Sequence, residues 1–352
     1  MDNRILIRFV IGGPARCGKT SLSSAIAASD DTCFVLGVDA LFRAILRRGM
    51  VNRVTPVRTT VTHFLTRGRF QDADRSVSES PLDYTALDIE TLAVTDAGEP
   101  VRAYADAIDA MAAAVGKTGW ATFDLHPEFA YRRLRRLVPG LKLAVMFRDP
   151  AEAIAAVLYW RREGKPAEHS RREFRRAVVL WGLAATATLS HRDRWPDDVC
   201  ILTLPRLIGD DGPVNVFGIK ARGAALDGVS GGSLHFRRAE GGFVHPDGQV
   251  VAMLSQRERA EIAALLYPLA RRVGLVLLAD DVTPRAGLAL RAYFSTLMSI
   301  ARFAPQAAAD LMDFLDTPFG VVRRRLSLLR EAAGALLRRN GTTATPAGQA
   351  HP

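Results

Sequence analysis

Short apolar runs alternate with amphipathic stretches along the first two thirds of the chain. The apolar runs predict buried strands at residues 5–11, 33–38, 120–123, 143–147 and 199–204. Between them, apolar residues at helical spacing predict helices, among them 102–115, 129–138 and 150–160. Strands that alternate with helices favour a parallel sheet. The pattern therefore predicts an α/β fold in which helices flank a doubly wound parallel sheet.

The last third of the chain has a different pattern. Residues 283–339 are largely helical in their spacing, and 321–339 carry six arginines on an apolar helix. Residues 340–352 are rich in Thr, Ala, Gly and Pro, a composition typical of disorder. We therefore expect three parts: an α/β domain at 1–280, a helical C-terminal extension at 281–339 and a disordered tail at 340–352.

A formal net charge of +10 and a pI near 10.0 favour anionic partners. The sequence has no aromatic-basic RNA signature and no helix-turn-helix, so we expect an anionic cofactor or a membrane surface rather than nucleic acid. The basic helix at 321–339 leaves peripheral attachment to a membrane as an alternative. The sequence leaves the oligomeric state open.

Three features predict a cytoplasmic location. No stretch reaches the ~18 uninterrupted apolar residues that a membrane span needs. The first strand follows Met1-Asp2-Asn3 almost directly, which leaves no room for a signal peptide. The three cysteines show no metal-ligand spacing, as is usual in a reducing compartment, and we expect no metal site.

The segment Gly13–Thr20 fits the phosphate-loop pattern G-x-x-x-x-G-K-[ST] in full and lies between a predicted strand and a predicted helix. Its glycines let backbone N–H groups turn toward an anion, and the helix adds the positive end of its dipole. Lys19 brings a charge to a terminal phosphoryl or sulfuryl group, and the Thr20 hydroxyl can ligate magnesium or donate to an oxygen. The residues expected to hold the cofactor here are Gly13, Arg16, Cys17, Gly18, Lys19, Thr20 and Ser21.

Other polar side chains follow the predicted strands. Asp39, Asp124, His126 and Arg148 all fall at carboxyl ends, where ligands of such sheets bind. His63 lies in the polar segment 49–81, which we expect to form loops over the site. The spacing therefore predicts one site at which several strands converge.

The run from Leu137 to Arg162, a strand, then Arg148-Asp149-Pro150, then a helix, resembles the second cofactor motif of the P-loop sulfotransferases. These enzymes use 3′-phosphoadenosine 5′-phosphosulfate, and the resemblance implies that Arg148 binds the 3′-phosphate of this cofactor. The segment 16–20 resembles the family's first loop. Arg237 and Arg238 lie in a segment similar to the one that also grips the 3′-phosphate. At the position of a further ligand, a serine in the family, this chain has Ala156.

The resemblance implies in-line sulfuryl transfer to the hydroxyl of a glycan, lipid or small molecule, without a metal. His126 stands upstream of Arg148 much as the catalytic histidine does in cytosolic members, and it would remove the acceptor proton. Lys19 and the loop amides would stabilise the leaving phosphate. Simpler roles stay open: His126 can cap a helix, Arg148 can pair with a nearby carboxylate, and Arg237 and Arg238 can lie in a solvated loop.

A second interpretation is a small-molecule kinase that uses ATP with magnesium. Lys19 and Thr20 complete the nucleotide loop for it. Asp39 or His63 would then contact the substrate, and Asp124 would join Thr20 at the metal. A third interpretation is a nucleotide-binding regulator without turnover.

Overall fold

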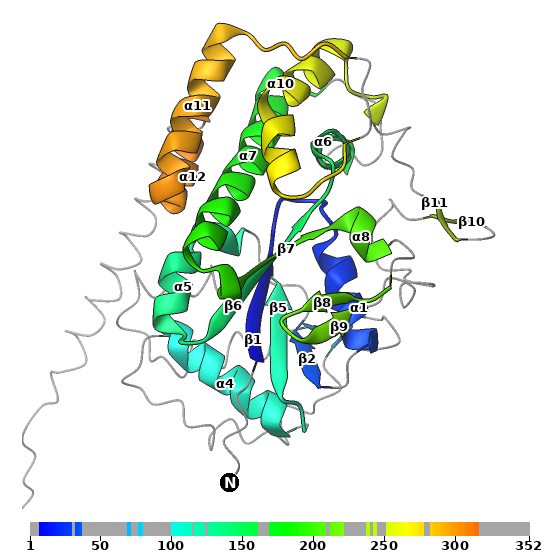
Figure 1. Cartoon of the computed structure of the whole chain (residues 1–352), viewed down its shortest axis with the longest axis vertical. Coiled ribbons are helices and arrows are strands. Elements are labelled where there is room, and N and C mark those ends of the chain that lie inside the picture. The colour runs from blue at the N-terminus through cyan, green and yellow to red at the C-terminus, as the bar shows by residue number, and fades with distance from the viewer. Residues whose placement is uncertain are drawn as a thin grey trace, which may run out of the picture.

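The fold is that of a computed structural model, which describes residues 7–29, 32–36, 69–71, 77–79, 100–114, 116–123, 126–160, 169–208, 212–221, 237–239, 242–244, 251–277 and 282–316. Its centre is a seven-stranded sheet in the order β4-β3-β2-β5-β1-β6-β7 (Figure 1). The strands are β1 (Ile7–Gly12), β2 (Cys33–Leu36), β3 (Arg69–Gln71), β4 (Val77–Glu79), β5 (Gly119–Phe123), β6 (Leu141–Phe147) and β7 (Val199–Thr203).

Strands β2, β5, β1, β6 and β7 are mutually parallel, whereas β3 and β4 add an antiparallel edge. Strand β1 lies between β5 and β6, and Val10 is in register with Thr122 and Leu143. Strand β5 is buried along its whole length, as is typical of a parallel strand that is covered on both faces. The segments that follow β5, β1 and β6 therefore meet at one edge of the sheet.

Helices flank this sheet. They are α1 (Lys19–Ser29), α4 (Pro100–Ala114), α5 (Tyr131–Leu137), α6 (Pro150–Trp160), α7 (Arg171–Arg194), α8 (Leu204–Ile208) and α10 (Gln256–Arg272). Short 3-10 turns, η1 (Pro127–Phe129) and η2 (Pro196–Asp198), precede α5 and β7. Two hairpins lie between α8 and α10 in the sequence: β8 (Val214–Val216) with β9 (Ile219–Ala221), and β10 (Arg237–Ala239) with β11 (Gly242–Val244). The predicted α/β class with a helix-flanked parallel sheet is confirmed, while its doubly wound character stays a prediction.

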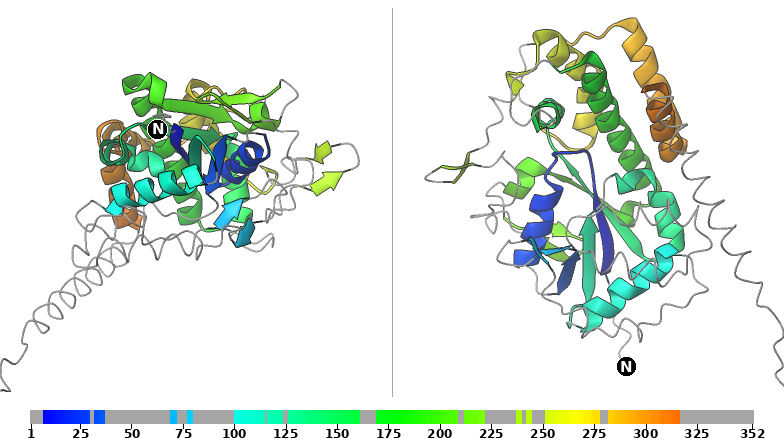
Figure 2. Two further views of the ribbon diagram at one scale, coloured as in Figure 1. Left: turned by 90° about the horizontal axis from the view of Figure 1, so that it is seen from below. Right: turned by 180° about the vertical axis from the view of Figure 1, so that it is seen from behind.

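Helices α11 (Leu288–Phe303) and α12 (Pro305–Asp316) lie within the predicted C-terminal extension. They run along α7 on the opposite side of the molecule from α1 (Figure 2). Phe294, Leu297 and Met312 belong to the same hydrophobic core as the sheet. The extension is thus packed onto the α/β unit as far as Asp316; the boundary at residue 281 stays a prediction, and residues 317–352 lie outside the described part.

Helices α7 and α11 pack closely against each other at Gly182. A Cβ atom built at this glycine would lie 2.6 Å from two ring atoms of Phe294 and 3.2 Å from the sulfur of Met298. We expect Gly182→Ala to lower the free energy of unfolding by about 1–3 kcal/mol through overpacking. Without this contact, alanine would stabilise the helix by about 1 kcal/mol relative to glycine. A lower free energy of unfolding in Gly182→Ala therefore indicates the close contact.

Urea unfolding measures this effect, and a double-mutant cycle with Phe294→Leu supplies the control. The smaller leucine side chain makes room for the added methyl group, so the cost of Gly182→Ala should shrink in that background. A stabilising Gly182→Ala variant would contradict the close contact between the two helices.

Candidate active site

The loop after β1 is shaped by residues with left-handed backbone angles. Gly13, Arg16 and Gly18 have φ values of 121°, 64° and 91°. A Cβ at Gly13 would lie 2.2 Å from the carbonyl oxygen of Met146 on β6, so only glycine fits there. Turns of this kind before the N-terminus of a helix are able to bind an anion. Helix α1 then begins at Lys19.

Lys19 reaches back over this loop. Its Nζ donates hydrogen bonds to the carbonyl oxygens of Gly13 at 2.7 Å and Pro14 at 2.9 Å. Thr20 is exposed, and Arg16 and Ser21 are half-buried. Burial lowers the pKa of the Arg16 guanidinium. The loop thus contains two basic side chains, Lys19 and the half-buried Arg16.

Cys17 is fully buried within the loop. Burial raises the pKa of its thiol to about 12, although the charges of Lys19 and Arg148 and a backbone hydrogen bond with Arg148 act in the opposite direction. The thiol is therefore protonated at neutral pH, and Cys17 serves as a packed, space-filling residue. Its contact with Arg148 also shows that the segment after β6 lies against the loop.

His126 lies just past β5 with a left-handed backbone, φ 58° and ψ 50°. Its ring is buried, stacks on Phe129 at a centroid distance of 4.9 Å and places Nδ1 2.9 Å from Oε1 of Glu128. A carboxylate accepts hydrogen bonds, so Nδ1 carries a proton, and in the neutral form of the ring the lone pair is on Nε2. The capping role that the sequence left open for His126 is not seen, because its side chain makes no cap hydrogen bond to η1.

Glu128 is a residue of the candidate site that the sequence reasoning missed. Its side chain is fully buried, and its second oxygen, Oε2, accepts the backbone N–H of Gly13 at 3.2 Å. A Cβ at Gly12 would lie 2.6 Å from this same oxygen, so a second glycine before the loop is needed for the contact. One carboxylate therefore joins the histidine after β5 to the loop after β1. The acidic residue two places after His126 was the available signal.

Charge and burial act against each other at Glu128. Burial alone would raise the pKa of this carboxyl, but the hydrogen bond and charge of His126 and the charge of Lys19 together hold it below the usual 4.5. Burial lowers the pKa of nearby His191, which is therefore neutral, and its Nε2 lies 2.8 Å from the backbone oxygen of Glu128. Glu128 is thus a buried, ionised group whose carboxylate contacts His126 and Gly13 and whose backbone oxygen contacts His191.

Arg148 follows β6, and its side chain is almost fully buried. Its Nε donates to Oε2 of Glu152 at 2.9 Å, one turn into α6. The pairing with a nearby carboxylate that the sequence left open is therefore present. The adjacent Asp149 caps α6, because its Oδ1 accepts the N–H groups of Ala151 at 2.8 Å and Glu152 at 3.2 Å. Glu152 thus orients Arg148 beside the loop.

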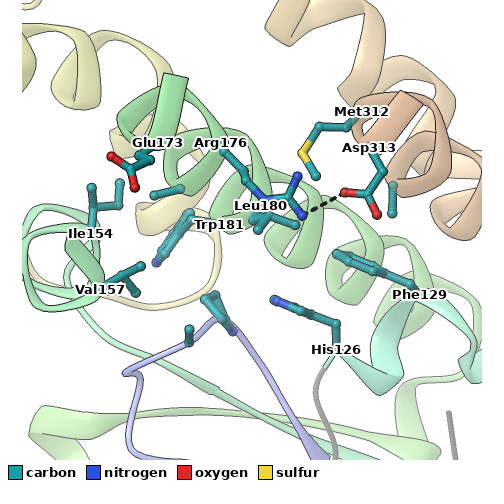
Figure 3. Close-up of a pocket in the computed structure, with 15 residues that line it drawn as sticks. His126, Phe129, Ile154, Val157, Glu173, Arg176, Leu180, Trp181, Met312 and Asp313 are labelled. Carbon is teal, nitrogen blue, oxygen red and sulfur yellow. Dashed lines mark hydrogen bonds and ion pairs between the residues drawn. The ribbon is translucent and has the colours of Figure 1, made fainter. Parts of the chain in front are cut away.

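A cavity of about 190 Å³ opens between the phosphate loop and three helices. Pro14 and Ala15 line it from the loop and His126 from the segment after β5, while α6, α7 and α12 form its walls. Figure 3 shows the ring of His126 pointing into this space, below Leu180 and Trp181 of α7. At one side, Nη2 of Arg176 donates to Oδ1 of Asp313 at 2.7 Å. The loop and the histidine thus border a common space.

For the other predicted site residues, a place at this loop stays a prediction. Asp39, His63 and Asp124 lie outside the described residues. Arg237 and Arg238 lie on β10, whose hairpin projects away from the main sheet in Figure 1. In the described part of the chain, no group of three or more His, Cys, Asp and Glu residues is placed to hold a metal ion. No helix in the same part combines the length and apolar character needed to cross a membrane.

No known family model matches the chain, and no curated protein matches its sequence. Among solved structures, the chain is similar to the sulfotransferase domain of the olefin synthase from Synechococcus PCC 7002. The identity is 13%, the match covers 84% of this chain and 96% of that domain, and the TM-score is 0.41. A likeness of this degree carries no argument about activity.

Proposed function

We propose that this protein is a sulfotransferase that moves a sulfuryl group from 3′-phosphoadenosine 5′-phosphosulfate to an acceptor hydroxyl. The observation that carries the proposal is the placement of His126, whose ring lines the same cavity as Pro14 and Ala15 of the phosphate loop. Its Nδ1 is held by a buried carboxylate, which leaves Nε2 as the basic nitrogen. A general base beside an anion-binding loop is the arrangement that group transfer to a hydroxyl needs.

The residues present fit an anionic sulfuryl donor. The loop at residues 13–18 packs tightly against β6, since a Cβ at Gly13 would collide with the carbonyl oxygen of Met146, and its left-handed residues together with the start of α1 suit a phosphate group. Residues Gly13 to Ser21 would hold the donor together with Arg148, which is fixed by Glu152 at the neighbouring strand end. When bound, the donor supplies an activated sulfuryl group on a phosphate leaving group. Lys19 contributes positive charge where the leaving oxygens develop negative charge.

The protein's own groups perform the proton transfer. Nε2 of His126 accepts the proton of the acceptor hydroxyl, and the ionised carboxylate of Glu128 stabilises the imidazolium that forms. The N–H of Gly13 holds the other oxygen of Glu128, so the base is fixed relative to the loop. The apolar walls of the cavity keep water away from the hydroxyl that reacts.

Calorimetry on the purified protein tests the proposal. We expect tight binding of 3′-phosphoadenosine 5′-phosphate without metal and weak binding of ATP with magnesium. ATP binding that requires magnesium and shows no preference for a 3′-phosphate would overturn the proposal and favour a kinase, with Asp39 and Asp124 as the next residues to replace. Tight binding of the bisphosphate without transfer to any hydroxyl would favour a regulator instead.

A substitution at Arg148 tests the cofactor assignment. We expect Arg148→Ala to weaken binding of the 3′-phosphorylated nucleotide by about tenfold or more, because a charged hydrogen bond to phosphate contributes about 1.5–3 kcal/mol. ATP binding should change much less. Calorimetry with both nucleotides measures the difference.

The matched control for this variant is Arg135→Ala. Arg135 is also an arginine in an ion pair, with Asp198 at 2.7 Å, but it lies on α5 away from the loop. This control should leave both affinities unchanged. Equal losses for the two nucleotides in Arg148→Ala would count against contact with the 3′-phosphate.

A further inference from the structure

The cavity beside His126 is bordered mainly by apolar side chains from elements that are far apart in the sequence. Ile154 and Val157 come from α6, Leu180 from α7 and Met312 from α12 (Figure 3). An apolar cavity of roughly 150 Å³ accepts a molecule as large as benzene. The cavity in this protein, at about 190 Å³, therefore has room for a body of about one ring with a short substituent.

Trp181 of α7 lines the same cavity, and its indole nitrogen has no hydrogen bond. The residue is 1% exposed, and its Nε1 is buried without a hydrogen-bond partner in the part of the chain that the structure describes. The ring is fixed by an edge-to-face contact with Phe147 at the end of β6, with 5.5 Å between the ring centroids. An indole N–H is a donor only, so a group that pairs with it must accept a hydrogen bond.

A buried tryptophan N–H normally has a partner, because an unpaired donor loses its bond to water on folding. Trp120 follows this rule, since its Nε1 donates to Oδ1 of Asp109 at 2.7 Å. Trp181 differs from Trp120 in bordering a cavity. A ligand oxygen in that cavity would supply the bond, so the free energy lost by burying the N–H would be recovered when a suitable ligand binds.

Such an oxygen could belong to the acceptor or to the sulfuryl group of the donor. The proposed place of the sulfuryl group is beside Lys19 on the loop, whereas the indole of Trp181 lies between Val157 of α6 and Leu180 of α7 (Figure 3). Apolar neighbours with a single donor suit a neutral oxygen better than a charged group. The surroundings of Trp181 therefore favour an oxygen of the acceptor.

We infer that the indole N–H of Trp181 binds an oxygen of the acceptor other than its reacting hydroxyl. The acceptor is then a compact, largely apolar alcohol with a second oxygen in a carbonyl, ether or hydroxyl group. This inference rests on the proposed function, because the reacting hydroxyl must reach Nε2 of His126. It makes Trp181 a specificity-determining residue, since an alcohol of the same shape without the second oxygen leaves the buried N–H unpaired.

Two phenols of matched shape test the inference. The probe p-hydroxyacetophenone carries a carbonyl oxygen, and p-isopropylphenol has a methyl group in its place. Each is added without donor, at a mildly acidic pH where both phenols are un-ionised, and heteronuclear NMR follows the indole N–H signals of the four tryptophans. We expect p-hydroxyacetophenone to move the Trp181 signal downfield and p-isopropylphenol to leave it nearly unchanged. The signal of Trp120, which is already bonded to Asp109, is the internal control.

The deciding variant is Trp181→Phe, which removes the N–H and keeps an aromatic ring. The indole signal that is lost in this variant is assigned to Trp181. The ratio of the affinities for p-hydroxyacetophenone and p-isopropylphenol should fall by about three- to tenfold, the usual effect of one hydrogen bond between neutral groups. Trp195→Phe is the matched control, because Trp195 packs against Tyr131 and does not line the cavity, and it should keep the wild-type ratio.

The outcomes separate the inference from the proposed function. No binding of p-hydroxyacetophenone, an equal shift of the Trp181 signal with both phenols, or an unchanged ratio in Trp181→Phe would overturn the inference, even in a protein shown to transfer sulfuryl groups. The same downfield shift with 3′-phosphoadenosine 5′-phosphosulfate alone would also overturn it, since the N–H would then bind a sulfuryl oxygen.

The expected shift and ratio in a protein that does not bind the 3′-phosphorylated nucleotide would support Trp181 as an oxygen-binding residue and overturn only the proposed function. If Trp181→Phe does not fold, proton contacts between the indole and the ring of Phe147 assign the Trp181 signal in the wild type. The response of that signal to the two phenols then decides.

Discussion

Replacement of His126 by asparagine is expected to lower the turnover number for sulfuryl transfer by about three orders of magnitude, within the usual contribution of a general base. Asparagine has no basic nitrogen to accept the acceptor's proton. It also tolerates the left-handed backbone found at residue 126, so the local fold is kept. Its side-chain amide can still donate to Glu128. The fall in the turnover number should therefore reflect the missing general base and not unfolding of the protein.

Steady-state kinetics and calorimetry on the same preparation check this prediction. The turnover number should fall while the affinity for 3′-phosphoadenosine 5′-phosphate stays within a few-fold of the wild type. His169→Asn is the matched control, because His169 also contacts a carboxylate, Glu258 at 2.6 Å, but lies outside the cavity lining. A His126→Asn enzyme that keeps a tenth or more of its activity would show that His126 is not the base.

The second large effect is expected at Glu128, which acts through His126 and is a positioning residue. Glu128→Gln keeps the size of the side chain but removes the charge that stabilises the imidazolium and fixes the proton on Nδ1. We expect the turnover number to fall about 100-fold, since a comparable change of a buried carboxylate behind a catalytic histidine costs up to about 10⁴-fold. Glu258→Gln, beside His169, should leave the turnover number unchanged.

The pH dependence distinguishes positioning from a merely structural role. In Glu128→Gln the protonated imidazole loses its charge partner, so the acidic limb of the kcat/KM profile should move to lower pH. Stability gives a second readout. The pKa of Glu128 is held below 4.5 in the folded protein, so its ionised form contributes stability above pH 4.5, and that contribution is lost as the pH falls through the folded pKa. Urea unfolding should therefore show the wild type losing stability more steeply than Glu128→Gln below pH 4.5. An unchanged pH profile of kcat/KM in Glu128→Gln would contradict the positioning role of Glu128.

The parts of the fold that were predictable are set by neighbours in the sequence. The apolar run before Gly13 and the amphipathic run after Lys19 indicated a strand, a loop and a helix, and β1 and α1 occupy these positions. Asp149 and Pro150 indicated the start of a helix, and the Asp149 side chain caps α6 there. Caps and periodic apolar residues act within a few residues, so one sequence is sufficient to predict them.

The missed features depend on contacts between distant segments. Glu128 reaches the loop only because β5 and β1 are adjacent in the sheet, and nothing near residue 128 indicates that order. The helix predicted at 129–138 starts later in the structure: a 3-10 turn at Pro127–Phe129 comes first, and α5 begins only at Tyr131. The part of α12 in the cavity wall likewise arises from the packing of α11 and α12 on α7.

The contact between Glu128 and the loop also has a consequence for how sequences of this kind can diverge. Gly12 leaves the space into which the carboxylate fits, and His126 supplies the partner that keeps this buried group ionised. A side chain at residue 12 would displace Glu128, and a residue at 126 that cannot donate a hydrogen bond would leave this buried charge without its partner. Residues 12, 126 and 128 therefore depend on one another, and we expect related sequences to keep all three residues or to replace them together.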